Sequence, residues 1–168
     1  MTNHDTAGAG LEIIDLRDRP DLAAAVADIQ YCQWAEFTGL SRDEMHALFR
    51  PGVAPGGLPV TLIAVDGSEV AAIVSLRHIT MGAVTHPEVY LDGVYPWLSN
   101  MWVAEWARGQ KLATRITVAV EDVARELGFG TIYSSTAMED SLYHKLGYRT
   151  IGQNPHHGLT IYLIQKEL

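Results

Sequence analysis

The chain has 168 residues, of which 48% are hydrophobic and 19% charged, a composition that predicts one globular domain with its own apolar core. Its formal net charge of −8 disfavours general nucleic-acid binding, which needs a basic face. The single cysteine excludes an intrachain disulfide, and no apolar run reaches the length of a membrane span. We therefore expect a cytoplasmic protein with neither nucleic acid nor a membrane as a partner.

The chain is expected to begin with a tail, a strand and a long helix. Residues 1–10 are polar and glycine-rich and predict a disordered tail, which leaves 11–168 as a single domain. Residues 11–16 favour a strand. Apolar residues at helical spacing then predict a helix over 19–39 that ends at Gly39.

A second, short helix is predicted over 41–49, because Ser41 and Glu44 have the spacing of a capping box. Residues 50–59 are rich in proline and glycine and favour a loop. Two β-branched runs flank the dipeptide Asp66-Gly67, which predicts an antiparallel hairpin over 60–79.

The middle of the chain combines an irregular segment with a clear strand–helix pair. Residues 80–96 predict a long loop, and loops of this length in compact domains are often functional. Residues 97–103 predict a buried strand. An apolar stripe at helical spacing predicts a helix over 109–127 that ends at Gly128.

The last part of the chain is expected to return to strands. Residues 131–135 predict a strand, and Thr136 with Glu139 forms a second capping-box pattern, which predicts a helix that ends at Gly147. Two further strands are predicted over 148–152 and 159–167, as antiparallel neighbours. Because the crossover after 97–103 must be parallel, the order of elements predicts a mixed α/β sheet with helices on both faces.

The stretch "NMWVAEWARGQKLATRI" (100–116) is a candidate anion site. A strand that leads into a helix exposes unpaired backbone N–H groups and the positive end of the helix dipole. Arg108, Lys111 and Arg115 are spaced so that their side chains can share one face of the first turns. A solvated helix face after a tight turn explains the same residues without a ligand.

The stretch "SLYHKLGYRTIG" (141–152) contributes a candidate acid. A tyrosine within a short helix is most often a core aromatic. Tyr143 is also suited to be a general acid, because a phenol can return a proton to a departing thiolate.

Together these stretches resemble the GNAT superfamily of acyl-CoA-dependent N-acyltransferases. "RGQKLA" (108–113) is similar to the family's phosphate loop, and "LYHKLGY" (142–148) is similar to its Leu-Tyr-x-x-Leu-Gly-Phe signature. The resemblance implies an α+β fold whose central sheet is mostly antiparallel, with one parallel, splayed strand pair. The sequence departs from the family pattern at Lys111, where the loop has glycine, and at Thr136, where relatives often have asparagine.

The resemblance further implies a direct transfer, in which an amine attacks the thioester of acetyl-CoA or another acyl-CoA and Tyr143 protonates the leaving thiolate. The pantetheine arm would lie beside the strand 97–103, and the pyrophosphate would rest on the turn at 108–113. The residues implied in donor binding are Met101, Trp102, Val103, Arg108, Gly109, Gln110, Lys111, Leu112, Ala113, Arg115 and Thr136.

The acceptor is expected to be a small-molecule amine, and relatives build its site near the long loop. Candidate acceptor residues are His78, Glu88, Asp92, Tyr95 and Trp97. His86 joins His78, Glu88 and Asp92 as a candidate base, a water chain being the alternative. The pair His156-His157 has no partner at metal-ligand spacing, so no metal is expected.

Alternatives remain open at this point. Lys111 could indicate a donor carried on the phosphopantetheine of an acyl carrier protein instead of free CoA. A non-catalytic acyl-CoA sensor would keep the fold without the reaction. The C-terminal strands are plausible pairing edges for a homodimer.

Overall fold

The computed structural model describes residues 10–50 and 57–168. The predicted tail and the middle of the predicted loop 50–59 lie outside these residues. None of the helices in the described ranges is long and apolar enough to cross a membrane.

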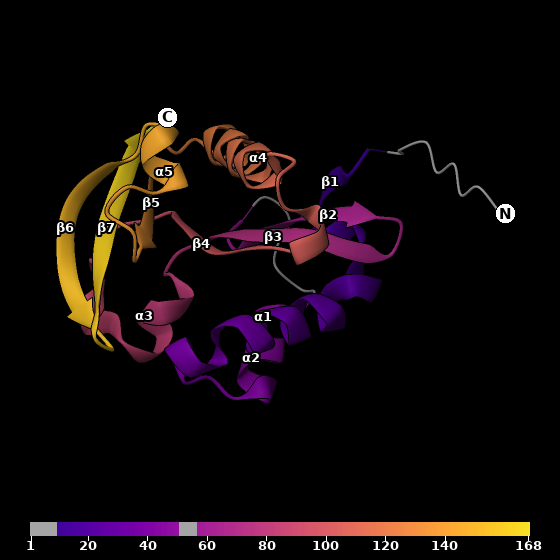
Figure 1. Ribbon diagram of the computed structural model, residues 1–168, viewed down its shortest axis with the longest axis horizontal. Coiled ribbons are helices and arrows are strands. Elements are labelled where there is room, and N and C mark those ends of the chain that lie inside the picture. Colours follow the sequence, from indigo (N-terminus) through magenta and orange to yellow (C-terminus); the bar gives the residue numbers. More distant parts are fainter. Residues whose placement is uncertain (1–9, 51–56) are drawn as a thin grey trace, which may run out of the picture.

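One seven-stranded sheet organises the chain, with the strand order β1-β2-β3-β4-β5-β7-β6 (Figure 1). The strands are β1 (Glu12–Asp15), β2 (Val60–Asp66), β3 (Glu69–Arg77), β4 (Trp97–Val103), β5 (Thr131–Thr136), β6 (Arg149–His156) and β7 (Leu159–Glu167). The pairing of β4 with β5 is parallel and the remaining pairings are antiparallel. The expected mixed, mostly antiparallel sheet is therefore confirmed.

Helices cover both faces of this sheet, with α4 on one side and α1 and α2 on the other (Figure 1). The α-helices are α1 (Ala23–Thr38), α2 (Arg42–Leu48), α3 (Met81–Thr85), α4 (Leu112–Glu126) and α5 (Leu142–Lys145). The 3-10 turns are η1 (Leu16–Asp18), η2 (Pro20–Leu22), η3 (Pro87–Val89) and η4 (Glu105–Ala107).

Alternation along the strands sends neighbouring residues into different cores. Leu62 and Val74 pack with the apolar stripe of α4, in which Ile116 is fully buried. Ile63 and Ile73 point the other way and pack against α1 and α2. The two cores hold the sheet between its helices and fix where α4 begins, which positions the candidate site.

Local signals account for several element ends. Gly39 ends α1 in the left-handed conformation with φ 69°, as its position in the sequence predicts. The Ser41–Glu44 capping box at the start of α2 is present in both directions. Gly67 has φ 61° in the turn between β2 and β3.

Two predictions of local structure are wrong. The segment 80–96 is not wholly irregular, because it contains α3 and η3. The second capping box is formed by Ser141 and His144, so the last helix begins at Leu142. Thr136 instead pairs with Tyr162 at the end of β5, and strand pairing takes precedence over the local capping pattern.

Candidate active site

Strands β4 and β5 touch at one end and then separate. Their register contains one pair, Trp97 with Tyr133, and the Ser134 hydroxyl donates a 2.9 Å hydrogen bond to the Leu98 carbonyl. Beyond this point β4 carries one extra residue relative to β3, and Asn100 lies there with φ 52°. Such a bulge bends a strand and takes backbone groups out of the ladder. It explains why the second half of β4 diverges from β5 and has no partner strand on that side.

The turn that follows β4 has the backbone geometry of an anion site. Gly109 has φ 78°, and Lys111 is the N-cap of α4 with φ 56° and ψ 21°. No side chain caps this helix, so the first N–H groups of α4 have no intrahelical or capping partner. The left-handed conformation at Lys111 is one that glycine adopts without strain. Lys111 therefore stands in a conformation that suits the glycine of the family's loop.

The basic side chains of the turn do not all face the same way. Arg115 donates a 3.1 Å hydrogen bond to the Leu11 carbonyl beside β1, which directs its guanidinium toward that strand. The Arg108 side chain is exposed, with Nε 3.4 Å from the Val103 carbonyl oxygen. Lys111 is also exposed. Among these three basic residues, Lys111 is the nearest in sequence to the uncapped N–H groups at the start of α4.

The other residues of the turn at 108–113 can contribute mainly backbone groups to a bound anion. Leu112 is buried in the core under α4 and Ala113 is half-buried, while the Gln110 side chain is exposed. In β4, Met101, Trp102 and Val103 are half-buried and lie along the strand half that has left β5.

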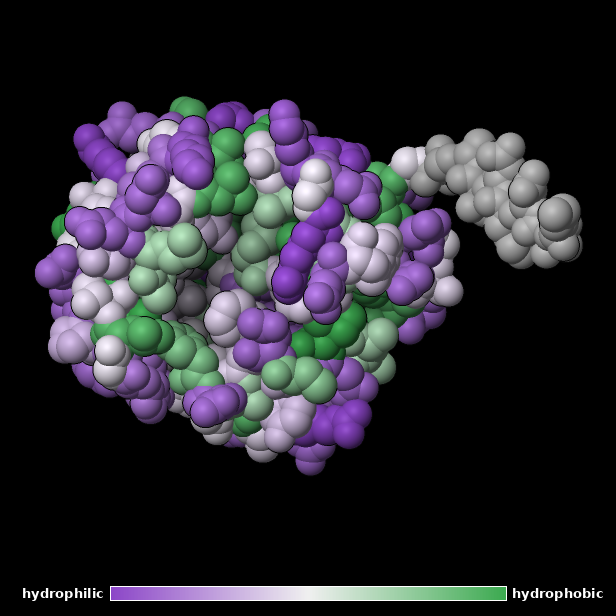
Figure 2. Space-filling model, in the orientation of Figure 1, coloured by the Kyte–Doolittle hydropathy of each residue, from purple (hydrophilic) through white to green (hydrophobic). Residues whose placement is uncertain are grey.

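A cavity of about 420 Å³ opens between the diverging strands. Its wall combines the end of α1, the start of α3, the β4 bulge, the end of β5, α5 and β7. Met101, Thr136 and Tyr143 all line it, so the structure brings together residues predicted from separate stretches. Figure 2 shows the molecule hollowed between α3 and α5, with hydrophobic residues along the rim.

Tyr143 carries its hydroxyl in a desolvated part of this wall. Burial raises the pKa of Tyr143 above the usual range of a phenol, and a hydrogen bond with Ser134 offsets part of that rise. The tyrosine ring also packs edge-on against Tyr148, with 5.5 Å between the ring centroids. The side chain is therefore protonated at neutral pH and held in place.

The predicted acceptor residues lie elsewhere. Among the residues that the structure describes, the cavity wall includes none of them. Trp97 is 1% exposed in a core and donates its indole N–H to the Val94 carbonyl at 2.8 Å. The His78 and Tyr95 rings pack at a tilt, with Phe129 next to Tyr95, at the opposite end of β4 from the turn at 108–113. Glu88 and Asp92 are exposed.

Other wall residues carried no signal in the sequence. Asn100 is 8% exposed, lines the cavity, and has no hydrogen-bond partner for either side-chain polar atom. Its role depends on the bulge, which is set by pairing with β3 and leaves no local pattern. Trp34 and Phe37 come from the end of α1, where they follow the spacing of ordinary core residues.

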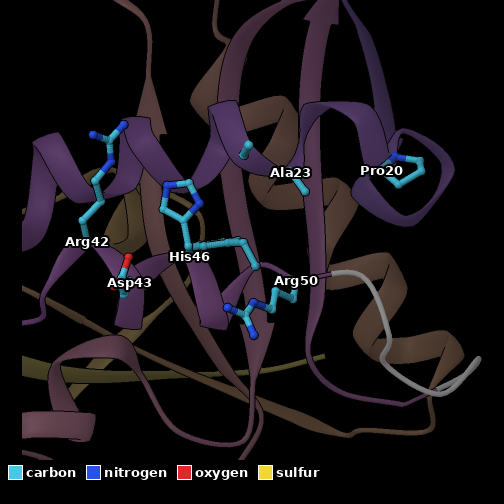
Figure 3. A pocket seen from close by; sticks show the side chains of 8 residues that line it. Pro20, Ala23, Arg42, Asp43, His46 and Arg50 are labelled. Carbon is cyan, nitrogen blue, oxygen red and sulfur yellow. The ribbon is translucent and has the colours of Figure 1, made fainter.

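A second, more open depression lies on the outer side of α1 and α2 (Figure 3). Arg42 and His46, which line it, are already paired with Asp28, at 2.8 and 2.6 Å. These two partners hold the pKa of Asp28 below its usual range, the His46 hydrogen bond contributing most. The depression includes no residue of the turn at 108–113 or of α5, so it is separate from the candidate active site.

β4 and β5 form a splayed parallel pair, an uncapped helix start follows β4, and Tyr143 lines the cavity between the two strands. This combination is typical of an acyltransferase. The model of the GNAT acetyltransferase family matches residues 26–148. The chain belongs to this family. The resemblance of "RGQKLA" and "LYHKLGY" to the family's motifs is thereby confirmed.

Solved structures share the fold across nearly the whole chain. An aminoglycoside 6′-acetyltransferase type Ii matches with a TM-score of 0.67 and 21% identity, over 93% of this chain and 96% of the other. An aminoglycoside 6′-N-acetyltransferase complexed with coenzyme A matches with a TM-score of 0.66 and 18% identity, over 93% of this chain and 96% of the other. An acyl-CoA N-acyltransferase from Pseudomonas aeruginosa matches with a TM-score of 0.66 and 15% identity, over 94% of this chain and 99% of the other. Comparison with curated protein sequences gives no match.

Proposed function

We propose that this protein transfers an acetyl group from acetyl-CoA to a small-molecule amine by direct attack. The observation that carries the proposal is the single cavity that joins the β4–β5 gap to Tyr143. A thioester lying in the gap would have its sulfur near a protonated phenol. The solved relative that binds coenzyme A has the same fold, which supports CoA as the donor.

The donor would be held mainly by backbone groups. The pantetheine amides would pair with the free edge of β4 at Met101 and Val103, as an added strand would. The pyrophosphate would accept hydrogen bonds from the first N–H groups of α4, at the positive end of the helix dipole. Lys111 and Arg108 would add positive charge at the surface of that turn.

The reaction needs a neutral amine, an oxyanion stabiliser and an acid. The amine nitrogen attacks the thioester carbonyl, and a backbone N–H of β4 stabilises the oxyanion that forms. When the C–S bond breaks, Tyr143 donates its proton to the thiolate and recovers one from solvent. The excess proton on the nitrogen leaves to water, because the described part of the cavity wall carries no carboxylate and no histidine.

The acceptor end of the cavity favours an amine with an apolar body. Trp34, Phe37 and Met81 line it, and no charged side chain is found on the wall among residues 10–50 and 57–168. A polycation would lose hydration there without gaining a carboxylate partner. We therefore infer that arylalkyl or alkyl amines are better acceptors than polyamines or aminoglycosides, although aminoglycoside acetyltransferases share the fold.

The left-handed conformation of Lys111 also favours free CoA over a carrier-bound donor. The lysine fits the phosphate turn, so its presence needs no different donor to explain it. A carrier protein would present phosphopantetheine without the adenosine diphosphate portion. Calorimetry with CoA and with phosphopantetheine separates the two: comparable affinities would favour the carrier.

The decisive experiment measures CoA release from acetyl-CoA with a panel of amines. The panel should contain arylalkylamines, alkylamines, a polyamine and an aminoglycoside, with Tyr143→Phe as the matched control protein. We expect release with the apolar amines and strongly reduced release with the variant. Tight acetyl-CoA binding without transfer to any amine would overturn the proposal and favour a sensor.

A further inference from the structure

A cluster of histidines lies beside the candidate active site, where the β6–β7 turn meets the end of α3. It contains His86, His156 and His157, and one ring nitrogen of each lies within 4.8 Å of the others. The ring centroid of His156 lies 4.5 Å from that of His86 and 4.2 Å from that of His157. Figure 1 shows the β6–β7 turn next to α3. Because His86 is far away along the chain, the sequence alone shows only the adjacent pair.

The turn conformation explains why two adjacent histidines can point the same way. Neighbouring side chains in a strand normally face opposite sides of the sheet. Here β6 ends at His156, which pairs with Leu159, and the two residues between them have φ 47° (His157) and 75° (Gly158). Positive φ at both central positions is the pattern of a type I′ hairpin turn. Leaving the strand conformation at His157 allows its ring to fold back toward His156.

His156 has the environment of a metal ligand. It is 8% exposed, and its Nε2 atom has no hydrogen-bond partner. The backbone of Phe37 also contacts this ring as a hydrogen-bonding group. Metal-binding histidines characteristically use one nitrogen for the ion and donate the other N–H to a carbonyl or carboxylate. The unpartnered Nε2 of this buried ring is therefore available to an ion.

We propose that His86, His156 and His157 bind one divalent transition-metal ion, with Zn²⁺ as the best fit. Imidazole nitrogens suit zinc, nickel and copper, whereas Mg²⁺ and Ca²⁺ require oxygen ligands. In a tetrahedral zinc site the ligand nitrogens are roughly 3.4 Å apart, from Zn–N bonds of about 2.05 Å. The nitrogens of the cluster lie within 4.8 Å of one another, so the rings would have to approach further around an ion. Water would complete the coordination, since His157 is exposed.

Nearby groups support a cation at this position. The Glu88 carboxylate oxygen Oε1 lies 3.6 Å from His86 Nδ1, so a negative charge stands next to the cluster. The same region is already tied together, because the Asn154 side-chain amide donates to the Val89 carbonyl and joins β6 to η3. The ion would add a second link between the β6–β7 turn and α3.

The position of the site gives the ion a structural consequence. The Phe37 ring packs edge-on against His156, with 4.9 Å between centroids, and Phe37 also lines the cavity of the candidate active site. Fixing His156 would therefore stiffen one wall of that cavity. The ion is assigned a positioning role and takes no part in bond making.

The test is titration of the metal-free protein, carrying no histidine tag, with Zn²⁺. We expect saturable binding of one ion, a rise in melting temperature, and no comparable effect of Mg²⁺. His86→Gln and His157→Asn should each weaken Zn²⁺ binding at least tenfold. Asparagine suits the left-handed position of His157, so that variant keeps the turn. X-ray absorption of the zinc-loaded protein should show imidazole nitrogen ligands.

His46→Gln is the matched control, because His46 lies on α2, paired with Asp28 and outside the cluster. Its Zn²⁺ affinity should equal that of the unmodified protein. The proposal is overturned if no saturable binding is observed, or if binding survives in both cluster variants. It is also overturned if His46→Gln weakens binding as much as they do. These readouts do not depend on acetyl transfer.

Discussion

Gly109 and Lys111 both adopt left-handed backbone conformations, two residues apart, in the turn before α4. The pair leaves the first N–H groups of the helix uncapped and available to an anion. Glycine takes such a conformation freely, whereas a residue with a β-carbon is strained there. Lysine at this position therefore lowers stability somewhat and places a positive charge at the mouth of the proposed donor site.

Lys111→Gly should stabilise the protein and weaken donor binding. Relief of the left-handed conformation is worth about 1–2 kcal/mol, reduced by about 0.5–1 kcal/mol for the entropy of an added glycine. Urea unfolding should therefore show a gain of up to about 1.5 kcal/mol in the free energy of unfolding. Lys111→Gln keeps the β-carbon and should leave stability unchanged.

The same two variants separate charge from backbone in donor binding. Both should bind acetyl-CoA about threefold to tenfold more weakly at low ionic strength, since an exposed ionic contact contributes roughly 1 kcal/mol. The difference from the unmodified protein should shrink in high salt because the charge is screened. Equal affinity of Lys111→Gln at low salt would show that the lysine does not contact the phosphates.

Sequence patterns predicted those parts of the molecule that local interactions determine. Ser41 and Glu44 form the expected capping box because nothing else competes for their groups. The same pattern does not start a helix at Thr136. This residue ends β5 and pairs with Tyr162 in β7, and its hydroxyl accepts a 3.1 Å hydrogen bond from the Met138 N–H. A local pattern cannot report that tertiary competition.

The candidate site divides in the same way. The turn at 108–113 and Tyr143 lie in continuous motifs, so a resemblance to a known family singles them out from the sequence, and their roles stay predictions. Asn100 depends on a bulge fixed by the register with β3. Phe37 reaches the cavity only because α1 packs across the sheet. Such residues become visible when distant segments are brought together.

Tyr143→Phe should lower kcat by about a hundredfold or more, the usual contribution of a positioned general acid. The KM for acetyl-CoA and the melting temperature should change little, because the ring and its packing on Tyr148 are retained. Steady-state kinetics and thermal unfolding provide the two measurements. An unchanged kcat would remove Tyr143 from the reaction.

The pH profile should follow the amine and not a protein histidine. No carboxylate or histidine of the described chain lines the cavity, so kcat/KM should rise about tenfold per pH unit with the neutral amine fraction. The upper break should move when an amine of different pKa is used. A break near pH 6.5 for both amines would instead indicate a histidine base.

At high pH the raised pKa of Tyr143 sets the pH up to which the acid stays protonated. Burial raises the pKa of this tyrosine, so the protonated acid persists above the usual range of about 10. Activity should therefore show no descending limb below about pH 10. A fall in kcat around pH 8–9 that is absent from Tyr143→Phe would contradict this assignment.

Asn100→Gly should raise the KM for the amine while leaving the fold intact. Glycine keeps the left-handed backbone of the β4 bulge, and removing a buried amide without partners relieves a desolvation cost. We expect unchanged or slightly higher stability and about a tenfold loss in kcat/KM, the value of one hydrogen bond to an acceptor. Asn100→Ala keeps a β-carbon in the strained conformation and should be less stable than Asn100→Gly. An unchanged KM would show that the amide does not face the acceptor.

The buried ion pair between Glu121 and Lys166 should control how firmly α4 is fixed to the C-terminal strand. Glu121 is 1% exposed, its Oε2 accepts a 2.7 Å hydrogen bond from Lys166 Nζ, and the same ammonium lies over the Tyr148 ring. Lys166→Met leaves the carboxylate buried without its main partner, which should cost about 3 kcal/mol.

The double variant Glu121→Leu, Lys166→Met removes both charges and should recover most of that loss, since hydrophobic replacement of a buried pair is often neutral. Urea unfolding is the suitable measurement, because guanidinium would screen the charges being compared. If the single and double variants lose the same free energy, the packing of the lysine side chain matters more than the unpaired carboxylate. Because α4 presents its N-terminus to the donor turn, the single variant should also weaken acetyl-CoA binding, and the double variant should restore it.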